Sequence, residues 1–205
     1  MTADFLITAF VTLFVVIDPI GLTPLFVALT PGADAAHRRA IGLRAALIAL
    51  ALLAAFAVFG EALLGFVGIS MPAFRIAGGI LLFLTALDML FQRRQQRRED
   101  QAEQPHQPDP SVFPLAIPLI AGPGAIATVI LLSGQHPGIL GLAAVLGVAA
   151  AVLLVALALF LAAGLLERVL GPTGINVVTR LLGMLLAALS VQFVLEGLRD
   201  FGIAS

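Results

Sequence analysis

The sequence predicts an all-α membrane protein: six transmembrane helices as two inverted three-helix repeats, with helices 1 and 4 discontinuous. Three observations lead to this prediction: an apolar composition, six long apolar runs, and a similarity between the two halves of the chain. Of the 205 residues, 60% are hydrophobic and 11% are charged, and the mean hydropathy is +1.11. A soluble domain of this length cannot bury so much apolar surface, which leaves the polytopic membrane class.

Residue types that the chain lacks exclude several kinds of site. There is no Cys, and therefore no disulfide, thiolate metal ligand or redox centre. Trp and Tyr are also absent, so Phe must replace the usual aromatic residues at the membrane interface. We expect no cofactor, apart from a coupling H⁺ or Na⁺, and no bound metal centre.

Six apolar runs are each long enough to cross a hydrocarbon core of about 30 Å as a helix. Prolines interrupt the first run at Pro19 and Pro24, and the fourth at Pro118 and Pro123. Such interruptions inside a bilayer expose backbone groups that must face protein or a wet cavity. The runs cover residues 5–29, 40–64, 73–91, 112–132, 139–163 and 175–198.

A polar segment rich in Arg, Gln and Pro separates the third run from the fourth. We therefore expect a first three-helix repeat over residues 1–91, a cytoplasmic polar linker over 92–111, and a second three-helix repeat over 112–205. The two repeats are expected to form one integral membrane domain.

The distribution of Arg predicts the orientation of the chain in an inner membrane. Six spans place the loops at 30–39, 92–111 and 164–174 on one side, and the loops at 65–72 and 133–138 on the other. The second set of loops carries no Arg, which predicts that both termini are periplasmic. The first set and its flanks carry Arg38, Arg39, Arg44, Arg93, Arg94, Arg97, Arg98 and Arg168.

An internal repeat relates the two halves of the chain. The segment from Glu61 to Leu82 reads EALLGFVGISMPAFRIAGGILL, and the segment from Glu167 to Leu186 reads ERVLGPTGINVVTRLLGMLL. Each half has three spans, an odd number, so the two halves must enter the membrane from opposite sides. Inverted repeats with one broken helix each are typical of secondary transporters, whose site lies near the midplane between the repeats.

The first break is Asp18-Pro19-Ile20-Gly21, which has the pattern of a helix start within an apolar run. An ionised Asp at this depth costs roughly 2.5–3.5 kcal/mol, which suggests a role beyond capping. Asp18 either binds a substrate ammonium group, a proton or Na⁺, or only caps the second half-helix. Pro19 and Gly21 belong to the same candidate binding site.

The second break, at residues 121–125, is rich in Gly and has no side chain able to bind a ligand. This segment could instead bind a ligand through its backbone. Its amide groups lie at the positive end of a helix dipole and, without side chains in the way, can approach a carboxylate closely. The candidate binding residues are therefore Gly122, Pro123, Gly124 and Ala125. The alternative is a kink that serves helix packing alone.

Four further polar residues have two interpretations each. Thr23 and Thr128 lie one turn beyond the breaks, and either supply hydroxyl ligands or satisfy freed backbone carbonyls. Arg75 and Arg180 occupy equivalent positions in the third and sixth spans. Each is either a structural charge, tied to Glu61, Glu167 or a carbonyl at a break, or a gate that contacts a carboxylate.

Signals for an enzyme or a nucleic-acid partner are weak. His37, His106 and His136 lie in loops or at their edges, and dinucleotide and phosphate-loop motifs are absent. The basic cluster in the linker is explained by the positive-inside rule. We expect neither catalysis nor nucleic-acid binding.

Several stretches resemble the MarC family of bacterial and archaeal membrane proteins. They are DPIGLTPLF at 18–26 with ALT at 28–30, GISMPAFRIAGG at 68–79, PLAIPLIAGPGAIA at 114–127, GINVVTRLLG at 174–183 and VQF at 191–193. The resemblance implies a six-span inner-membrane protein that transports small neutral amino acids of the glycine and alanine type.

Together these observations predict a secondary transporter that is coupled to H⁺ or Na⁺ and binds a zwitterion between the two breaks. The alternatives are an exporter of drugs or other small metabolites, and a non-transporting membrane scaffold. Expected partners are a small neutral amino acid and the lipid bilayer. The sequence leaves open whether the protein forms a homo-oligomer.

Overall fold

The computed structural model describes residues 2–94, 96–97 and 109–203 of the chain. Within these residues there is no strand, and each predicted apolar run falls on one helix or on a consecutive pair. The all-α prediction is therefore confirmed. The elements are α1 (Ala3–Ile17), α2 (Pro19–Leu29), α3 (Ala35–Val67), α4 (Met71–Leu90), the π-type helix η1 (Ser111–Ile120), α6 (Pro123–Gln135), α7 (Ile139–Leu161) and α8 (Ala163–Asp200).

The number of candidate membrane spans depends on how a bent pair of helices is counted. In the described part of the chain, five stretches are long and apolar enough to cross a membrane: α1 with α2, α3, α4, α7 and α8. The pair η1 and α6, bent by 57°, makes a sixth if it is counted as one span. These helices confirm an integral membrane protein. Residues 98–108 of the predicted linker lie outside the described residues.

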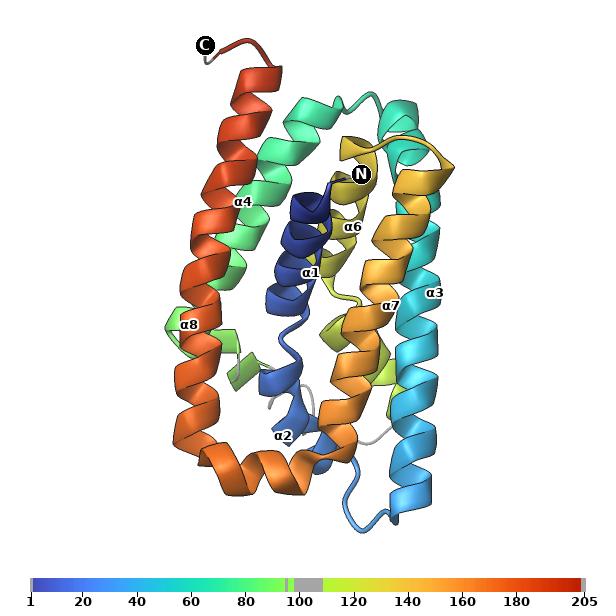
Figure 1. Cartoon of the computed structure of the whole chain (residues 1–205), viewed down its shortest axis with the longest axis vertical. Helices are drawn as coiled ribbons and strands as arrows, with labels where there is room; N and C mark the ends of the chain where they lie inside the picture. Colours follow the sequence, from blue (N-terminus) through green and yellow to red (C-terminus); the bar gives the residue numbers. More distant parts are fainter. Residues whose placement is uncertain (1, 95, 98–108, 204–205) are drawn as a thin grey trace.

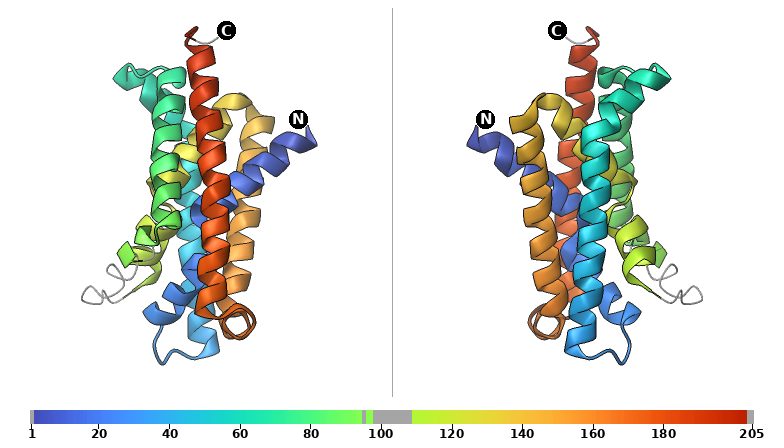
Figure 2. Two further views of the ribbon diagram at one scale, coloured as in Figure 1. Left: turned by 90° about the vertical axis from the view of Figure 1, so that its left-hand side faces the viewer. Right: turned by 90° about the vertical axis from the view of Figure 1, so that its right-hand side faces the viewer.

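The junction of α1 and α2 lies inside the bundle (Figure 1), while the start of α1 projects from its side (Figure 2). Of the most apolar 18-residue window of this pair, 61% is buried, against 22–33% for α3, α4, α7 and α8. Leu13 and Ile17 of α1 and Leu22 of α2 are fully buried. The Phe26 ring of α2 stacks on Phe160 of α7, with the ring centroids 4.7 Å apart. Because these two helices are apolar all round, protein rather than lipid surrounds most of their surface.

Both chain termini lie at one end of the bundle, with the α3–α4 and α6–α7 connections (Figures 1 and 2). The opposite end carries the α2–α3 connection, the beginning of η1 and the first turns of α8. Two of the three segments predicted as Arg-bearing loops, residues 30–39 and 164–174, therefore share one end.

One predicted loop is wrong, because most of residues 164–174 is helical. The helix α8 begins at Ala163 and is interrupted only at Gly171, whose φ of 61° suits glycine, with Pro172 following. Figure 1 shows the part before the kink lying across the end of the bundle. Its Leu165 and Val169 are 65% and 72% exposed. Apolar and charged residues alternate here at a helical spacing, which is typical of a helix in the membrane interface.

Helices α4 and α8 run antiparallel and approach each other backbone to backbone. A Cβ on Gly79 of α4 would lie 2.8 Å from the carbonyl oxygen of Ser190 and 3.1 Å from the amide nitrogen of Val194. A Cβ on Gly197 would likewise lie 3.1 Å from the Pro72 carbonyl oxygen. Glycine at these contacts permits the close approach that drives helix association in a membrane.

The helices of the two halves are interleaved. α3 and α7 pack against each other, and a Cβ on Gly42, near the start of α3, would lie 2.9 Å from Leu157 Cδ1, near the end of α7. α1 and α2 of the first half pack on α7 and α8 of the second. In the other direction, η1 packs on α3, and α6 packs on α3 and α4. Each central element is therefore surrounded mainly by helices of the other half.

We expect Gly79→Ala to destabilise the protein by about 1–3 kcal/mol, because the added methyl group overpacks a backbone contact. The measurement is thermal unfolding in detergent. Gly147→Ala is the matched control, since no described atom lies within 4 Å of a Cβ at that position. The control is expected to gain about 0.5–1 kcal/mol from helix propensity. Equal melting temperatures for the two variants would contradict the close α4–α8 contact.

Candidate functional site

The first break is a left-handed residue between two helices. α1 ends at Ile17, Asp18 has φ 56° and ψ 63°, and α2 begins at Pro19. Asp18 is fully buried, and its Oδ1 accepts a hydrogen bond of 3.1 Å from the amide of Gly21. A Cβ on Gly21 would lie 2.2 Å from Asp18 Oδ2, so glycine is what leaves room for the carboxylate. The protein thus places a carboxyl group of its own at the positive N-terminal end of α2.

The two threonines beyond the breaks bond to carbonyl groups of their own helices. Thr23 Oγ1 donates to the Pro19 carbonyl at 2.9 Å, and Thr128 Oγ1 donates to the Gly124 carbonyl at 2.8 Å. Both side chains are fully buried. Each hydroxyl therefore bonds back to the carbonyl group four residues earlier in its own helix, which satisfies the buried hydroxyl rather than a backbone group freed by the break.

The second break separates η1 from α6. η1 is irregular, with extended backbone at Phe113 and Ile117 and cis peptide bonds before Pro114 and Pro118. The N-cap residue of α6 is Gly122, which has no side chain to accept from the first turn of that helix. A Cβ at Gly122 would lie 2.6 Å from the Pro118 carbonyl oxygen, so the close approach of η1 accounts for glycine here.

A cavity of about 350 Å³ lies beside the second break. Predicted site residues Gly122, Pro123, Gly124 and Ala125 all line it, at the N-terminal end of α6. The other described residues of the predicted binding site, which are Asp18, Pro19, Gly21, Thr23 and Thr128, lie outside this lining. The remaining lining residues are Val16, Leu81, Leu84, Thr85, Asp88, Arg94, Arg97, Pro118, Leu119 and Ile120.

The two breaks are nevertheless neighbours. Val16, in the last turn of α1, lines the cavity, and a Cβ on Gly124 of α6 would lie 3.2 Å from Val16 Cγ1. The cavity is therefore bordered by the C-terminal end of one helix and the N-terminal end of another. These ends carry opposite partial charges, negative at α1 and positive at α6.

Sequence reasoning missed the polar residues on the cavity wall. Thr85 and Asp88 come from α4, and Arg94 and Arg97 follow it in the chain. Arg97 Nη1 lies 2.7 Å from Asp88 Oδ2 in an ion pair, and Arg94 Nη2 donates to the Val16 carbonyl. The feature of the sequence that could have revealed this wall is Asp88, because an ionisable residue inside an apolar run is a candidate functional residue.

The predicted structural charges differ from each other. Arg75, near the start of α4, forms an ion pair with Asp200 at the end of α8, rather than with Glu61 or a carbonyl at a break. This ion pair fastens the same two helices that the glycine contacts bring together. Arg180 is exposed on α8, away from the cavity lining.

The described residues offer no cluster for a metal ion, since no group of three or more His, Cys, Asp or Glu side chains converges in them. The cavity instead presents backbone at two helix ends, one hydroxyl group, one ion pair and one further guanidinium group. This set can bind a small charged or zwitterionic molecule without a cofactor.

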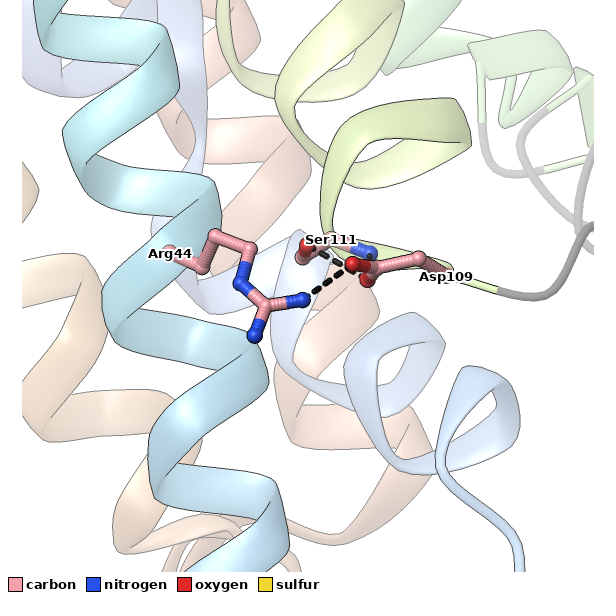
Figure 3. Close-up of polar contacts among 3 residues, drawn as sticks. All are labelled: Arg44, Asp109 and Ser111. Carbon is pink, nitrogen blue, oxygen red and sulfur yellow. Dashed lines mark hydrogen bonds and ion pairs between the residues drawn. The ribbon is translucent and has the colours of Figure 1, made fainter.

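The start of η1, and with it the cavity wall, is held by a carboxylate (Figure 3). Asp109 Oδ1 accepts from the Ser111 hydroxyl at 2.5 Å and from the Ser111 amide at 3.0 Å, while Arg44 of α3 pairs with Oδ2. Chiefly the Ser111 hydroxyl lowers the pKa of Asp109 below its usual value. Partial burial raises this pKa, and the Ser111 amide and Arg44 lower it further. Asp109 is therefore expected to be ionised at neutral pH.

We expect Gly21→Ala to destabilise the protein by about 1–3 kcal/mol, because its methyl group would displace the buried Asp18 carboxylate. Asp18→Asn is expected to cost less, since Asn keeps an oxygen acceptor and tolerates the left-handed conformation. The measurement is thermal unfolding in detergent. If Asp18→Asn proves as damaging as Gly21→Ala, the charge of Asp18 matters beyond its capping bond.

We expect Asp109→Asn to be less stable than the unmodified protein at about pH 7, by about 1 kcal/mol or less for this partly exposed group. A lowered pKa contributes stability above the unfolded pKa of about 3.9, and this contribution is lost as pH falls through the folded value. The stability difference between the two proteins should therefore shrink in acid. Melting curves at about pH 7 and pH 3 measure it, and a constant difference would contradict the assignment.

Comparison with known proteins agrees with this architecture. Residues 3–201 match the family described as MarC family integral membrane protein. The chain is 40% identical over 203 residues to UPF0056 membrane protein YvbG of Bacillus subtilis. The matched region covers 97% of this chain and 96% of that protein. It is 36% identical over 197 residues to UPF0056 inner membrane protein YhgN of Escherichia coli, covering 95% and 96%. No solved structure matches. The chain therefore belongs to the MarC family of integral membrane proteins.

Proposed function

We propose that this protein is a secondary transporter of small neutral amino acids, of the glycine and alanine type, across the inner membrane. The substrate carboxylate binds the amide groups at the start of α6, between Gly122 and Ala125. The substrate ammonium group lies towards the C-terminal end of α1, near the Val16 carbonyl and Asp18.

One observation carries this proposal: the two helix starts at the breaks differ in how their positive ends are filled. At α2 the Asp18 carboxylate accepts from Gly21, whereas at α6 the corresponding residue is Gly122, beside a cavity. Pro19 and Pro123 follow them as the first residues of the two helices. A substrate carboxylate at α6 would take the place that Asp18 takes at α2.

The cavity favours a small zwitterion over a larger ligand. Its volume of about 350 Å³ is at the lower end of the about 300–1,000 Å³ that is usual for ligand sites. Its lining consists of aliphatic, Gly, Pro, Thr and charged residues, without the aromatic or Met surface that suits varied drugs. The alternative of a drug exporter therefore has less support, and so has a scaffold, which gains nothing from a polar cavity at a helix break.

The packing of the helices supports two inverted repeats. The third helices of the two halves, α4 and α8, pack antiparallel, and so do the second helices, α3 and α7. The broken first helix of each half packs mainly on helices of the other half. Rocking of one half against the other would expose the cavity between α1 and α6 alternately to the two sides.

The charges support an orientation with both termini periplasmic. The Arg-bearing α2–α3 connection and first turns of α8 share one end of the bundle, and the two termini lie at the other end (Figure 1). The coupling ion is H⁺ or Na⁺, which we assign to Asp18 and the carbonyl groups beside it.

We expect purified protein in liposomes to accumulate glycine and alanine when a pH or Na⁺ gradient is imposed. Asp18→Asn is expected to retain binding and to lose the dependence on the gradient. Radiolabelled uptake is the measurement, with protein-free liposomes as the blank. Failure to move either amino acid under any gradient would contradict the substrate assignment, and unchanged coupling in Asp18→Asn would leave Asp18 as a cap.

A second pair of variants tests the site. Gly122→Asp would place at α6 the kind of carboxylate that caps α2, and is expected to block substrate binding by filling its place. Gly122→Ala is the matched control, because both variants have the same Cβ contact with Pro118 and differ in the carboxylate. We expect at least a tenfold lower rate of uptake for the Asp variant than for the Ala variant, as a charge-assisted contact is worth about tenfold or more. Equal rates would place the carboxylate site elsewhere.

A further inference from the structure

Arg94 joins the end of α4 to the end of α1. Its Nη2 donates to the carbonyl oxygen of Val16, and its Nη1 lies 3.1 Å from Met89 Sδ. The side chain is partly buried and forms part of the cavity wall, together with Gly122–Ala125. The neighbouring Arg93 is exposed instead, with its guanidinium carbon 5.9 Å from the centre of the Phe91 ring.

The Val16 carbonyl is a position that attracts a cation. It belongs to the last turn of α1, where the final carbonyl groups of a helix have no intrahelical partner and the dipole is negative. In the structure the guanidinium group of Arg94 occupies this position. Arg97, the other cationic residue on the wall, is paired with Asp88.

We propose that Arg94 is the inner gate of the cavity, a tethered cation that competes with the substrate for the end of α1. This proposal rests on the proposed function, which places the substrate ammonium group near the Val16 carbonyl. In the empty protein Arg94 bonds to that carbonyl and covers the cavity from the side of the Arg-rich loops. When a substrate binds, its ammonium group takes the place of the Arg94 guanidinium group at the Val16 carbonyl, and the Arg94 side chain moves away from the cavity.

Accessibility of the cavity tests the gate without any substrate. The chain has no Cys, so Thr85→Cys introduces a single thiol on the cavity wall in place of a hydroxyl group of similar size. A neutral methanethiosulfonate reagent is applied to the protein in liposomes, and the rate of modification is measured. Arg94→Gln is expected to raise this rate by about tenfold or more, since at least the charge-assisted hydrogen bond to the Val16 carbonyl is lost. Loss of a nearby positive charge would by itself slow the reaction by raising the thiol pKa. A faster reaction in Arg94→Gln can therefore be attributed to easier access to the cavity.

Arg93→Gln is the matched control, because it removes the same charge from the adjacent exposed residue. It is expected to leave the modification rate unchanged, and Arg94→Lys is expected to give an intermediate rate, since Lys keeps the charge without the planar fork. Size-exclusion profiles in detergent verify that each variant is folded. If Arg94→Gln misfolds, the modification rate of Arg94→Lys tests the proposal instead. No acceleration in a folded Arg94 variant, or equal acceleration in Arg93→Gln, would overturn the proposal.

Binding of alanine then distinguishes competition from direct recognition. A tethered competitor reduces the fraction of protein that can bind, so Arg94→Gln is expected to lower the apparent Kd for alanine by about tenfold. A higher Kd would mean that Arg94 holds the substrate carboxylate, which overturns the gate. If no variant binds glycine or alanine but Arg94→Gln still accelerates thiol modification, the gate stands and the proposed substrate class fails.

Discussion

Inside a bilayer, a helix that stops must find hydrogen-bond partners for its freed backbone groups within the protein itself. At the first break Asp18 accepts from the amide of Gly21, one of the N–H groups that lack an intrahelical partner at the start of α2. Arg94 reaches across from the end of α4 to the Val16 carbonyl. The arrangement of α1, α2 and the end of α4 around the first break depends on these two bonds, because each one compensates for backbone that lipid cannot solvate.

The two breaks differ in what lies at the start of the second helix: a side chain of the protein at α2 and a cavity at α6. Asp18 places a buried carboxyl group of the protein itself at the positive end of α2, where it accepts from Gly21. At α6 glycine leaves the equivalent end without a side chain, and the cavity lies there. Under the proposed function, a substrate carboxylate would occupy at α6 the place that Asp18 occupies at α2.

Close packing and ion pairs hold α4 in place away from the breaks. Glycine contacts bring the backbones of α4 and α8 together, and the Arg75–Asp200 ion pair fastens their ends on the side of the termini. At the other end of α4, Asp88 pairs with Arg97 on the cavity wall. α4 therefore carries an ion pair near each end, and movement of α4 and α8 as one unit would couple the cavity to both faces of the membrane.

The sequence by itself determined the membrane class, the six apolar segments, the two breaks and the capping potential of Asp18, because these follow from hydropathy, proline and local backbone chemistry. The periodicity of residues 164–174 was hidden by Gly171, Pro172 and adjacent charges, so a helix was read as a loop. Only the tertiary structure decided that Thr85, Asp88, Arg94 and Arg97 face the second break while Asp18 lies outside the cavity. These residues are far from Gly122 in the sequence, and their convergence depends on how α1, α4 and α6 pack. Local patterns specify where a helix begins and ends, whereas the direction in which a buried charge points is set by the neighbours that surround it.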